Sequence, residues 1–267
     1  MSELKQKLLY QSILLAWRRI GFRFSEKRNG LARFLWNEAM AIDINATQII
    51  YLEDLNLAYM AVPKVANSSI KTLMAKHLGL IGDEDRLGGL AYLFNHPETS
   101  SNLRQRGVLI SKKELLKLKN TNHNLNVLSV VRDPIERVRS FYSSCLASEV
   151  LMTKLSKFYG VDVFYNGMSF EQFLQQVILI PDLISNRHFQ SQYLFLSFEG
   201  NVIADEVYDF NQLSSHFIPR LEELGLDVSS FKNVNKGQKN EPIPISAEFN
   251  RKARIRFQKD YLLLEKL

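Results

Sequence analysis

The chain has few of the residues that form disulfides or bind metals. Among its 267 residues there is one cysteine, Cys145, so no disulfide can form within the chain. A lone cysteine argues against a small disulfide-stapled secreted module and favours a reducing cytoplasm, which we expect as the location. The five histidines are scattered and show no metal-ligand spacing. The sequence therefore predicts a protein without a metal centre.

Long apolar runs are missing as well. A membrane-spanning helix needs about 20 apolar residues, but the apolar stretch Leu8 to Trp17 contains polar residues and is followed by two arginines. The spacing of apolar and basic side chains over residues 4–24 predicts instead an amphipathic helix within residues 1–30. Packing onto the protein's own domain is the favoured interpretation of this helix. Peripheral contact with a membrane surface is the alternative.

The composition suits a globular protein that binds anions. With 46% hydrophobic and 11% aromatic residues, the chain can bury a large core. We expect one domain over residues 1–267, with its core over residues 47–265. The formal charge of +6 suits an anionic ligand, but it is too mild to indicate nucleic acid.

The first informative segment lacks the glycines that usually surround a bound phosphate. Leu57 to Val62 predicts a buried strand, residues 63–69 read Pro-Lys-Val-Ala-Asn-Ser-Ser, and Ile70 to Leu78 predicts a helix. Backbone N–H groups at a helix start attract an anion, and Lys64 adds a positive charge. The glycine spacing of a nucleoside-triphosphatase P-loop is absent, which disfavours a magnesium-dependent kinase or ATPase. The segment predicts a phosphate-binding turn of another kind.

A second segment repeats the order of strand, charged corner and helix. Val127 to Val131 predicts a strand, Arg132 follows it, and Pro134 fits the first turn of a helix. Open α/β sheets bind ligands at the carboxyl ends of their strands, where Arg132 would lie. Ser140 follows eight residues later, slightly over two helical turns, so its hydroxyl can point back toward the strand end. An arginine and a hydroxyl suit a second phosphate group.

These two segments resemble the donor-binding motifs of sulfotransferases, in the variant of the Golgi-type carbohydrate enzymes that act on chondroitin, dermatan and heparan chains. Residues 64–69 resemble the 5′-phosphosulfate loop, and residues 131–142 resemble the 3′-phosphate motif. Residues 186–192 resemble the D-x-H-W-x-P-Q segment, but with Asn, Phe and Ser where Asp, Trp and Pro are usual. Residues 234–237 resemble a late loop that closes over the nucleotide.

The resemblance implies that 3′-phosphoadenosine 5′-phosphosulfate is the co-substrate, that no metal is needed, and that the acceptor is a hydroxyl of a carbohydrate such as a polysaccharide or glycolipid. It also implies a P-loop-like three-layer α/β fold, and the alternation of predicted strands and helices favours the same central, mainly parallel sheet flanked by helices. The residues implied in donor binding are Lys64, Val65, Ala66, Asn67, Ser68, Ser69, Arg132, Ser140, Asn235, Lys236 and Gly237.

Two residues are candidates for the chemistry. Sulfonyl transfer builds charge on the oxygen that bridges sulfur and the 5′-phosphate, and Lys64 is the candidate cation there. His188 is the candidate base for the acceptor hydroxyl, with a structural or substrate-orienting histidine as the alternative. His96 is the second candidate base. Two other functions stay open: a magnesium-dependent nucleotide or phosphosugar kinase-like enzyme, and a non-catalytic protein that binds glycans or a membrane.

The remaining segments predict the other elements of the fold. The stretch from 82 to 107 is rich in turn-forming residues, and we expect it to be irregular and to form part of the acceptor cleft. Further strands are predicted over residues 47–53, 194–198 and 202–208, and further helices over residues 111–119, 134–158, 170–180, 210–224 and 247–264.

Overall fold

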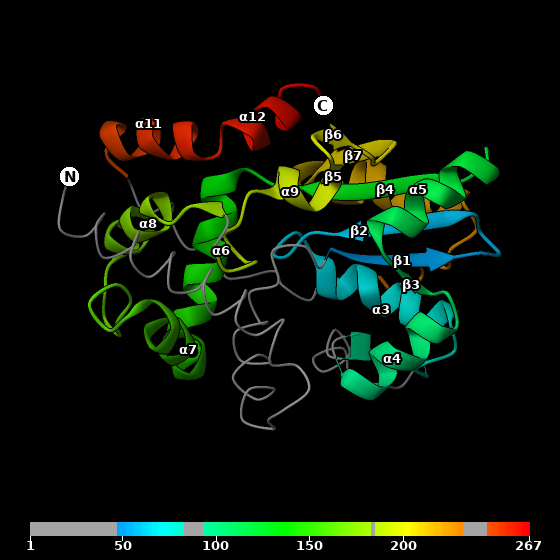
Figure 1. Ribbon diagram of the computed structural model, residues 1–267, viewed down its shortest axis with the longest axis horizontal. Helices are drawn as coiled ribbons and strands as arrows, with labels where there is room; N and C mark the ends of the chain where they lie inside the picture. The colour runs from blue at the N-terminus through cyan, green and yellow to red at the C-terminus, as the bar shows by residue number, and fades with distance from the viewer. Residues whose placement is uncertain (1–46, 83–92, 95, 183–184, 232–244) are drawn as a thin grey trace, which may run out of the picture. The chain divides into compact units, whose positions relative to one another are not determined.

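Figure 1 shows the computed structural model of the chain, which describes residues 47–82, 93–94, 96–182, 185–231 and 245–267. The chain divides into two compact units, and the expected single domain stays a prediction. We call them the sheet unit, residues 45–133, 191–242 and 259–267, and the helical unit, residues 1–44, 134–190 and 243–258. The predicted amphipathic helix within residues 1–30 lies outside the described residues.

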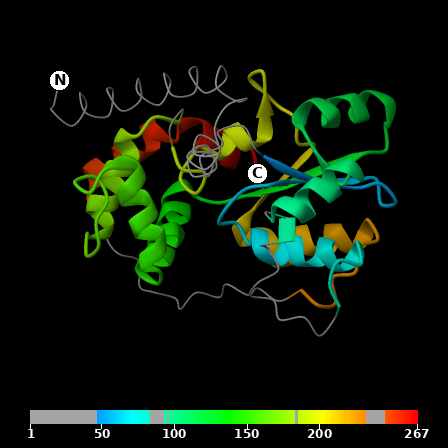
Figure 2. The same cartoon turned by 60° about the horizontal axis from the view of Figure 1, so that its bottom comes forward.

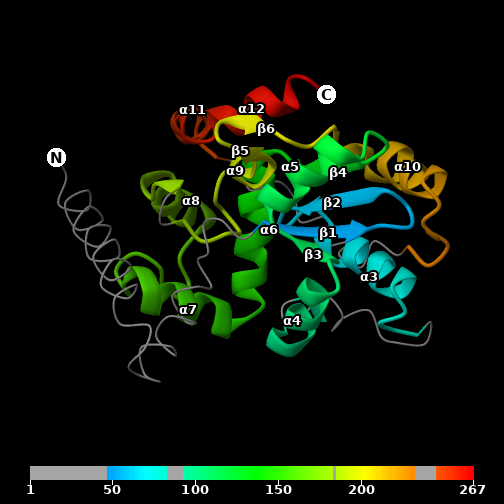
Figure 3. The same ribbon diagram turned by 45° about the vertical axis from the view of Figure 1, so that its right-hand side comes forward.

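The sheet unit contains a five-stranded sheet in the order β3-β1-β2-β4-β7 (Figures 1 and 3). The strands are β1 (Gln48–Leu52), β2 (Leu57–Ala61), β3 (Leu109–Ile110), β4 (Asn126–Val131) and β7 (Glu206–Asp209). β2, β4 and β7 pair in parallel, whereas β1 runs antiparallel to both β2 and β3. Four of the five strands therefore point the same way, which confirms the predicted mainly parallel sheet. A separate two-stranded hairpin of β5 (Ser197–Phe198) and β6 (Asn201–Val202) precedes β7 in the sequence.

Burial on both faces explains the sequence of the central strands. Every residue of β2 is buried, as are the last five residues of β4, so neither strand alternates between apolar and polar side chains. In Figure 2 the cyan α3 (Asn67–His77) and the orange α10 (Ile218–Glu223) cover one face of the sheet, and the green α5 (Lys112–Thr121) lies on the other. The mixed α/β fold with a central sheet flanked by helices is thus confirmed.

The helical unit contains α6 (Pro134–Leu146), α7 (Glu149–Tyr159), α8 (Phe170–Leu179) and α11 (Ala247–Arg256). Aromatic rings hold it together: Phe141 of α6 contacts Phe173 of α8, and Tyr159 at the end of α7 contacts Phe164 edge to face. Phe141 is 2% exposed and Tyr142 is 6% exposed. Both residues belong to the buried core.

Several predicted elements are corrected by the structure. The predicted helix 134–158 ends at Leu146 and restarts at Glu149, and the predicted helix 247–264 is two helices, α11 and α12 (Gln258–Leu264). The predicted strand 194–198 is mostly the short helix α9 (Gln192–Leu196), and only its last two residues form β5. A short apolar run fits a strand and a buried helical turn equally well, and tertiary contacts decide between them.

Smaller corrections concern loops and boundaries. Helix α3 begins at Asn67, three residues before the predicted start. The stretch 82–107, expected to be irregular, contains α4 (Pro97–Gln105), whose N-cap is His96. Residues 202–208 are not one strand, because β6 ends at Val202 and β7 begins at Glu206. The predicted helix 210–224 starts with a 3-10 turn, Phe210–Gln212, and a π-helical turn, Leu213–Phe217, before α10.

Candidate functional site

The two predicted anion-binding corners lie at the same edge of the sheet. β2 and β4 are parallel neighbours, with Tyr59 opposite Leu128. β2 ends at Ala61 and β4 ends at Val131, so the lysine loop and the arginine follow adjacent strand ends. The buried Ser129 hydroxyl donates to the Met60 carbonyl at 2.7 Å and ties the two strands together near that edge. This edge is where open parallel sheets bind ligands.

The backbone of the first corner is strained in the way an anion site needs. Lys64 and Ala66 both have left-handed conformations, with φ of 71° and 58°. Neither is glycine, so each holds a conformation that costs about 1–2 kcal/mol for an L-residue. Alternating left-handed and ordinary residues turn successive N–H groups to one side and form a concave anion nest. Lys64 and Ala66 thus adopt, with strain, the left-handed conformations that glycines adopt without strain in an ordinary P-loop.

The start of α3 completes this corner. Among the described residues no side chain caps the helix, and its first turn carries no acidic residue. The positive end of the helix dipole at this point favours an anion. Ser68 is half-buried and Ser69 is 3% exposed. The Asn67 side-chain oxygen is buried and has no hydrogen-bond partner among the described residues. A polar group in that state is typical of a site that a ligand completes.

Arg132 is held from two sides in the second corner. The side chain of Gln192 accepts a hydrogen bond from the Arg132 backbone N–H at 2.9 Å and donates one to the Arg132 carbonyl at 2.7 Å. The guanidinium lies over the ring of Phe210, 4.6 Å from its centre. Phe210 follows β7, the parallel neighbour of β4. The backbone and the charged group of Arg132 thus have separate supports.

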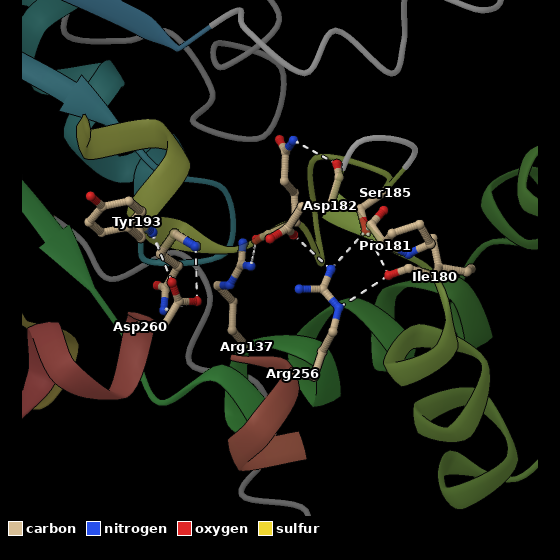
Figure 4. A network of polar contacts seen from close by, with 10 residues as sticks. Arg137, Ile180, Pro181, Asp182, Ser185, Tyr193, Arg256 and Asp260 are labelled. Carbon is tan, nitrogen blue, oxygen red and sulfur yellow. Dashed lines mark hydrogen bonds and ion pairs between the residues drawn. The ribbon is translucent and has the colours of Figure 1, made fainter. Parts of the chain in front are cut away.

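Helix α9, which begins with Gln192, is fixed at both ends by charged side chains. The buried carboxylate of Asp260 accepts hydrogen bonds from the backbone N–H groups of Gln192 at 2.9 Å and Tyr193 at 2.8 Å (Figure 4). At the other end Lys112 donates to the carbonyls of Leu194 at 2.6 Å and Ser197 at 2.7 Å. Burial lowers the pKa of Lys112 to about 8, so the ammonium is still the main form at neutral pH. Both charges favour the helix dipole.

In the helical unit, the structure defines the tautomer of His188. The Asn186 side-chain oxygen accepts from the His188 backbone N–H at 3.0 Å, and the same oxygen lies 2.7 Å from Nδ1 of the ring. Since a backbone N–H can only donate, the atom facing it must be the oxygen, and Nδ1 must carry a proton to meet it. The neutral ring therefore keeps its lone pair on Nε2. The ring stacks on Phe141 with centres 4.5 Å apart.

The segment that carries His188 is anchored by two arginines of the same unit, the buried Arg137 and the half-buried Arg256. Arg137 is fully buried and donates to the Gln190 carbonyl, so it braces this loop. Arg256 donates to Asp182 at 2.7 Å, Ser185 at 3.0 Å and Ile180 at 3.1 Å (Figure 4). These bonds hold the chain on the amino-terminal side of His188.

The other predicted site residues lie in various places. The sheet unit contains His96, which is the N-cap of α4. At the edge described above it also contains Lys64, Val65, Ala66, Asn67, Ser68, Ser69 and Arg132. Ser140 and His188 are half-buried residues of the helical unit. Asn235, Lys236 and Gly237 lie outside the described residues. Nothing among the described residues tests the roles assigned to any of these side chains.

Four residues that support predicted site residues, directly or through a neighbouring residue, are not marked by the sequence. Asn186 and Gln192 were visible only as the first and last residues of the weak 186–192 match. Phe210 follows the strand β7, which has no distinctive sequence pattern. Asp260 lies 67 and 68 residues from its partners Tyr193 and Gln192. No local signal connects an aspartate in a carboxyl-terminal helix to a backbone N–H that far away.

Comparison with known proteins identifies a family. The model of a family described as "Sulfotransferase family" matches residues 47–259. No curated protein and no solved structure gives a significant match to the chain. Within the described residues, no helix is both long enough and apolar enough to cross a membrane. The expected cytoplasmic location stays a prediction.

Proposed function

Since the chain belongs to the sulfotransferase family, we propose that it moves a sulfonate group from 3′-phosphoadenosine 5′-phosphosulfate to a hydroxyl of a carbohydrate. The observation that carries the proposal is the pair of anion-suited corners on adjacent parallel strands: the strained loop after β2 and Arg132 after β4. A donor with phosphate groups at both ends of its ribose needs two such corners. The family supports sulfonate transfer in general, and the donor and acceptor named here are our proposal.

In this proposal the lysine loop takes the 5′ end of the donor. The N–H groups of residues 64–69, with the hydroxyls of Ser68 and Ser69, would bind the 5′-phosphate. Arg132, with Ser140 of α6, would bind the 3′-phosphate through charge-assisted hydrogen bonds. The late loop with Asn235, Lys236 and Gly237 would close over the nucleotide.

The chemical step is an in-line displacement at sulfur. The acceptor oxygen forms a bond to sulfur while the bond from sulfur to the bridging oxygen breaks, and the electron pair stays on the 5′-phosphate. Negative charge grows on that phosphate during the step, so a Lys64 ammonium beside the bridging oxygen would stabilise the transition state more than the ground state. The products are a sulfate ester and adenosine 3′,5′-bisphosphate.

The proton of the acceptor hydroxyl needs a base. We assign it to Nε2 of His188, because the bond from Nδ1 to Asn186 leaves the lone pair on that nitrogen. Asn186 then has the orienting role that the third group has in catalytic triads. His96, at the N-cap position of α4, is the second candidate.

Calorimetry with adenosine 3′,5′-bisphosphate tests the proposal. We expect binding in the presence of EDTA, because fixed cations and N–H groups neutralise the phosphates. Absence of binding would refute the sulfotransferase proposal. Binding that requires Mg²⁺ would favour a kinase-like enzyme instead.

A further inference from the structure

The backbone of Arg132 leaves the sheet at the point where its side chain is needed. β4 ends at Val131, so the N–H and C=O of Arg132 lie beyond the strand ladder. The fully buried primary amide of Gln192 pairs with both groups, at 2.9 Å and 2.7 Å. Because a primary amide has the same donor and acceptor as a peptide group, Gln192 acts as one more residue of a neighbouring strand. It fixes the direction in which the Arg132 side chain leaves the backbone.

Gln192 is itself held by Asp260. The N-cap residue of α9, Ser191, makes no side-chain cap, and the carboxylate of Asp260 takes its place by accepting from the first two N–H groups of the helix. Asp260 is 1% exposed, and a buried carboxylate is stable only with such donors. The order of contacts runs from α12 through Asp260 and Gln192 to Arg132, entirely within the sheet unit.

We propose that Gln192 and Asp260 are positioning residues for Arg132, and that they set how strongly the protein binds the 3′-phosphate of its donor. The inference rests on the proposed function, since it assigns Arg132 to that phosphate. Phe210 supports the guanidinium, and Gln192 supports the backbone. A variant that loses the backbone support keeps Arg132, but the arginine side chain leaves the backbone in a different direction.

The test separates this role from a merely structural one. The full chain is titrated with adenosine 3′,5′-bisphosphate and with adenosine 5′-monophosphate, and the ratio of the two Kd values measures the 3′-phosphate contact alone. We expect the wild-type ratio to be roughly 10–100-fold, the size of charged hydrogen bonds, and Arg132→Ala to remove most of it. Gln192→Met, which keeps the length but has no amide, should lower the ratio at least about fivefold. Asp260→Asn should lower it less, because one oxygen acceptor remains.

Gln190→Met is the matched control. Gln190 is as buried as Gln192 and two residues away, but its side chain donates to the Asp182 carbonyl in the helical unit. Its loss should lower the melting temperature and leave the ratio unchanged. A folded Gln192→Met protein with the wild-type ratio would overturn the inference. If Gln192→Met does not fold, the Kd ratio of Asp260→Asn is the test, and a folded Asp260→Asn protein with the wild-type ratio would overturn the inference.

The measurements distinguish failure of the proposed function from failure of the positioning role alone. If the wild-type protein binds both nucleotides equally, the assignment of the 3′-phosphate to Arg132 is wrong and the positioning role falls with it. If Arg132→Ala loses the preference but Gln192→Met and Asp260→Asn keep it, the proposed function stands and only the positioning role is wrong.

Discussion

Gln192 forms two hydrogen bonds with the backbone of Arg132, one to each polar group, although 60 residues separate them in the sequence. The arginine follows a strand that the sequence predicts correctly, whereas the glutamine begins a helix most of whose residues the sequence predicts to be a strand. The position of the arginine side chain therefore depends on a part of the chain that local patterns describe poorly. Functional side chains are often placed by such distant, buried partners.

Loss of the Lys64 charge should slow sulfonate transfer far more than it weakens acceptor binding. We expect Lys64→Ala to lower kcat by about 10²–10³-fold, the usual effect of removing one group that stabilises a growing negative charge, with little change in the acceptor KM. Steady-state kinetics with labelled donor measure both constants. Lys113→Ala, which removes an exposed lysine of α5, is the control and should leave kcat unchanged. If Lys64→Ala instead raises KM by a similar factor and leaves kcat normal, Lys64 contributes to substrate binding and not to the chemical step.

The left-handed backbone at Ala66 predicts an unusual response to glycine. Ala66→Gly relieves about 1–2 kcal/mol of strain and loses a similar amount in methyl burial and chain entropy, so its free energy of unfolding should stay within about 0.5 kcal/mol of wild type. Ala75→Gly, inside α3, has no strain to relieve and should cost about 1–2 kcal/mol. Urea unfolding compares the two proteins. Equal losses in both would contradict the strained loop.

The tautomer of His188 can be observed directly. We expect nitrogen NMR shifts of the neutral ring to report a proton on Nδ1, because the Asn186 oxygen accepts it. Asn186→Leu should move the proton toward Nε2 and lower kcat, since the lone pair is then on the wrong nitrogen. His188→Ala should lower kcat by roughly 10²–10⁴-fold if the ring is the base. Near-normal turnover of His188→Ala would remove that assignment.

An ion pair beside the last parallel strand should make stability depend on acid pH. Hydrogen bonds from Arg220, at 2.8 Å, lower the pKa of Glu206 on β7. A carboxylate with a lowered pKa stabilises the fold above its usual pKa of 4.5, and this stability is lost as pH falls through the lower, folded-state pKa. Arg220→Met should thus cost about 1 kcal/mol at pH 7 and less at pH 3.

The control for that ion pair is an exposed one. Lys252 and Glu248 lie 2.5 Å apart on the surface of α11. Lys252→Met should leave the free energy of unfolding unchanged at either pH, because solvent screens an exposed pair. A pH-independent loss in Arg220→Met would show that packing of the arginine stem, not its charge, stabilises β7.

The sequence predicts the strands that carry the two corners well, because β2 and β4 are short, mainly apolar runs that are each followed within three residues by a charged residue. It predicts Lys64 and Arg132 as site residues for the same reason. Three features could not be predicted: the left-handed φ of Ala66, the helix at 192–196 and the capping of that helix by Asp260. Each depends on contacts between residues far apart in the sequence, and periodicity carries no information about these.

Transfer of radioactive sulfonate tests the central claim most directly. The full chain is incubated in EDTA with labelled 3′-phosphoadenosine 5′-phosphosulfate and a panel of polysaccharides, glycosaminoglycans, glycolipids and small alcohols. We predict label on the hydroxyl groups of at least one carbohydrate with the wild-type protein, and a loss of about 10²–10³-fold in rate with Lys64→Ala. Tight donor binding without transfer to any acceptor in the panel would contradict the account and identify a binding protein that has the fold but not the reaction.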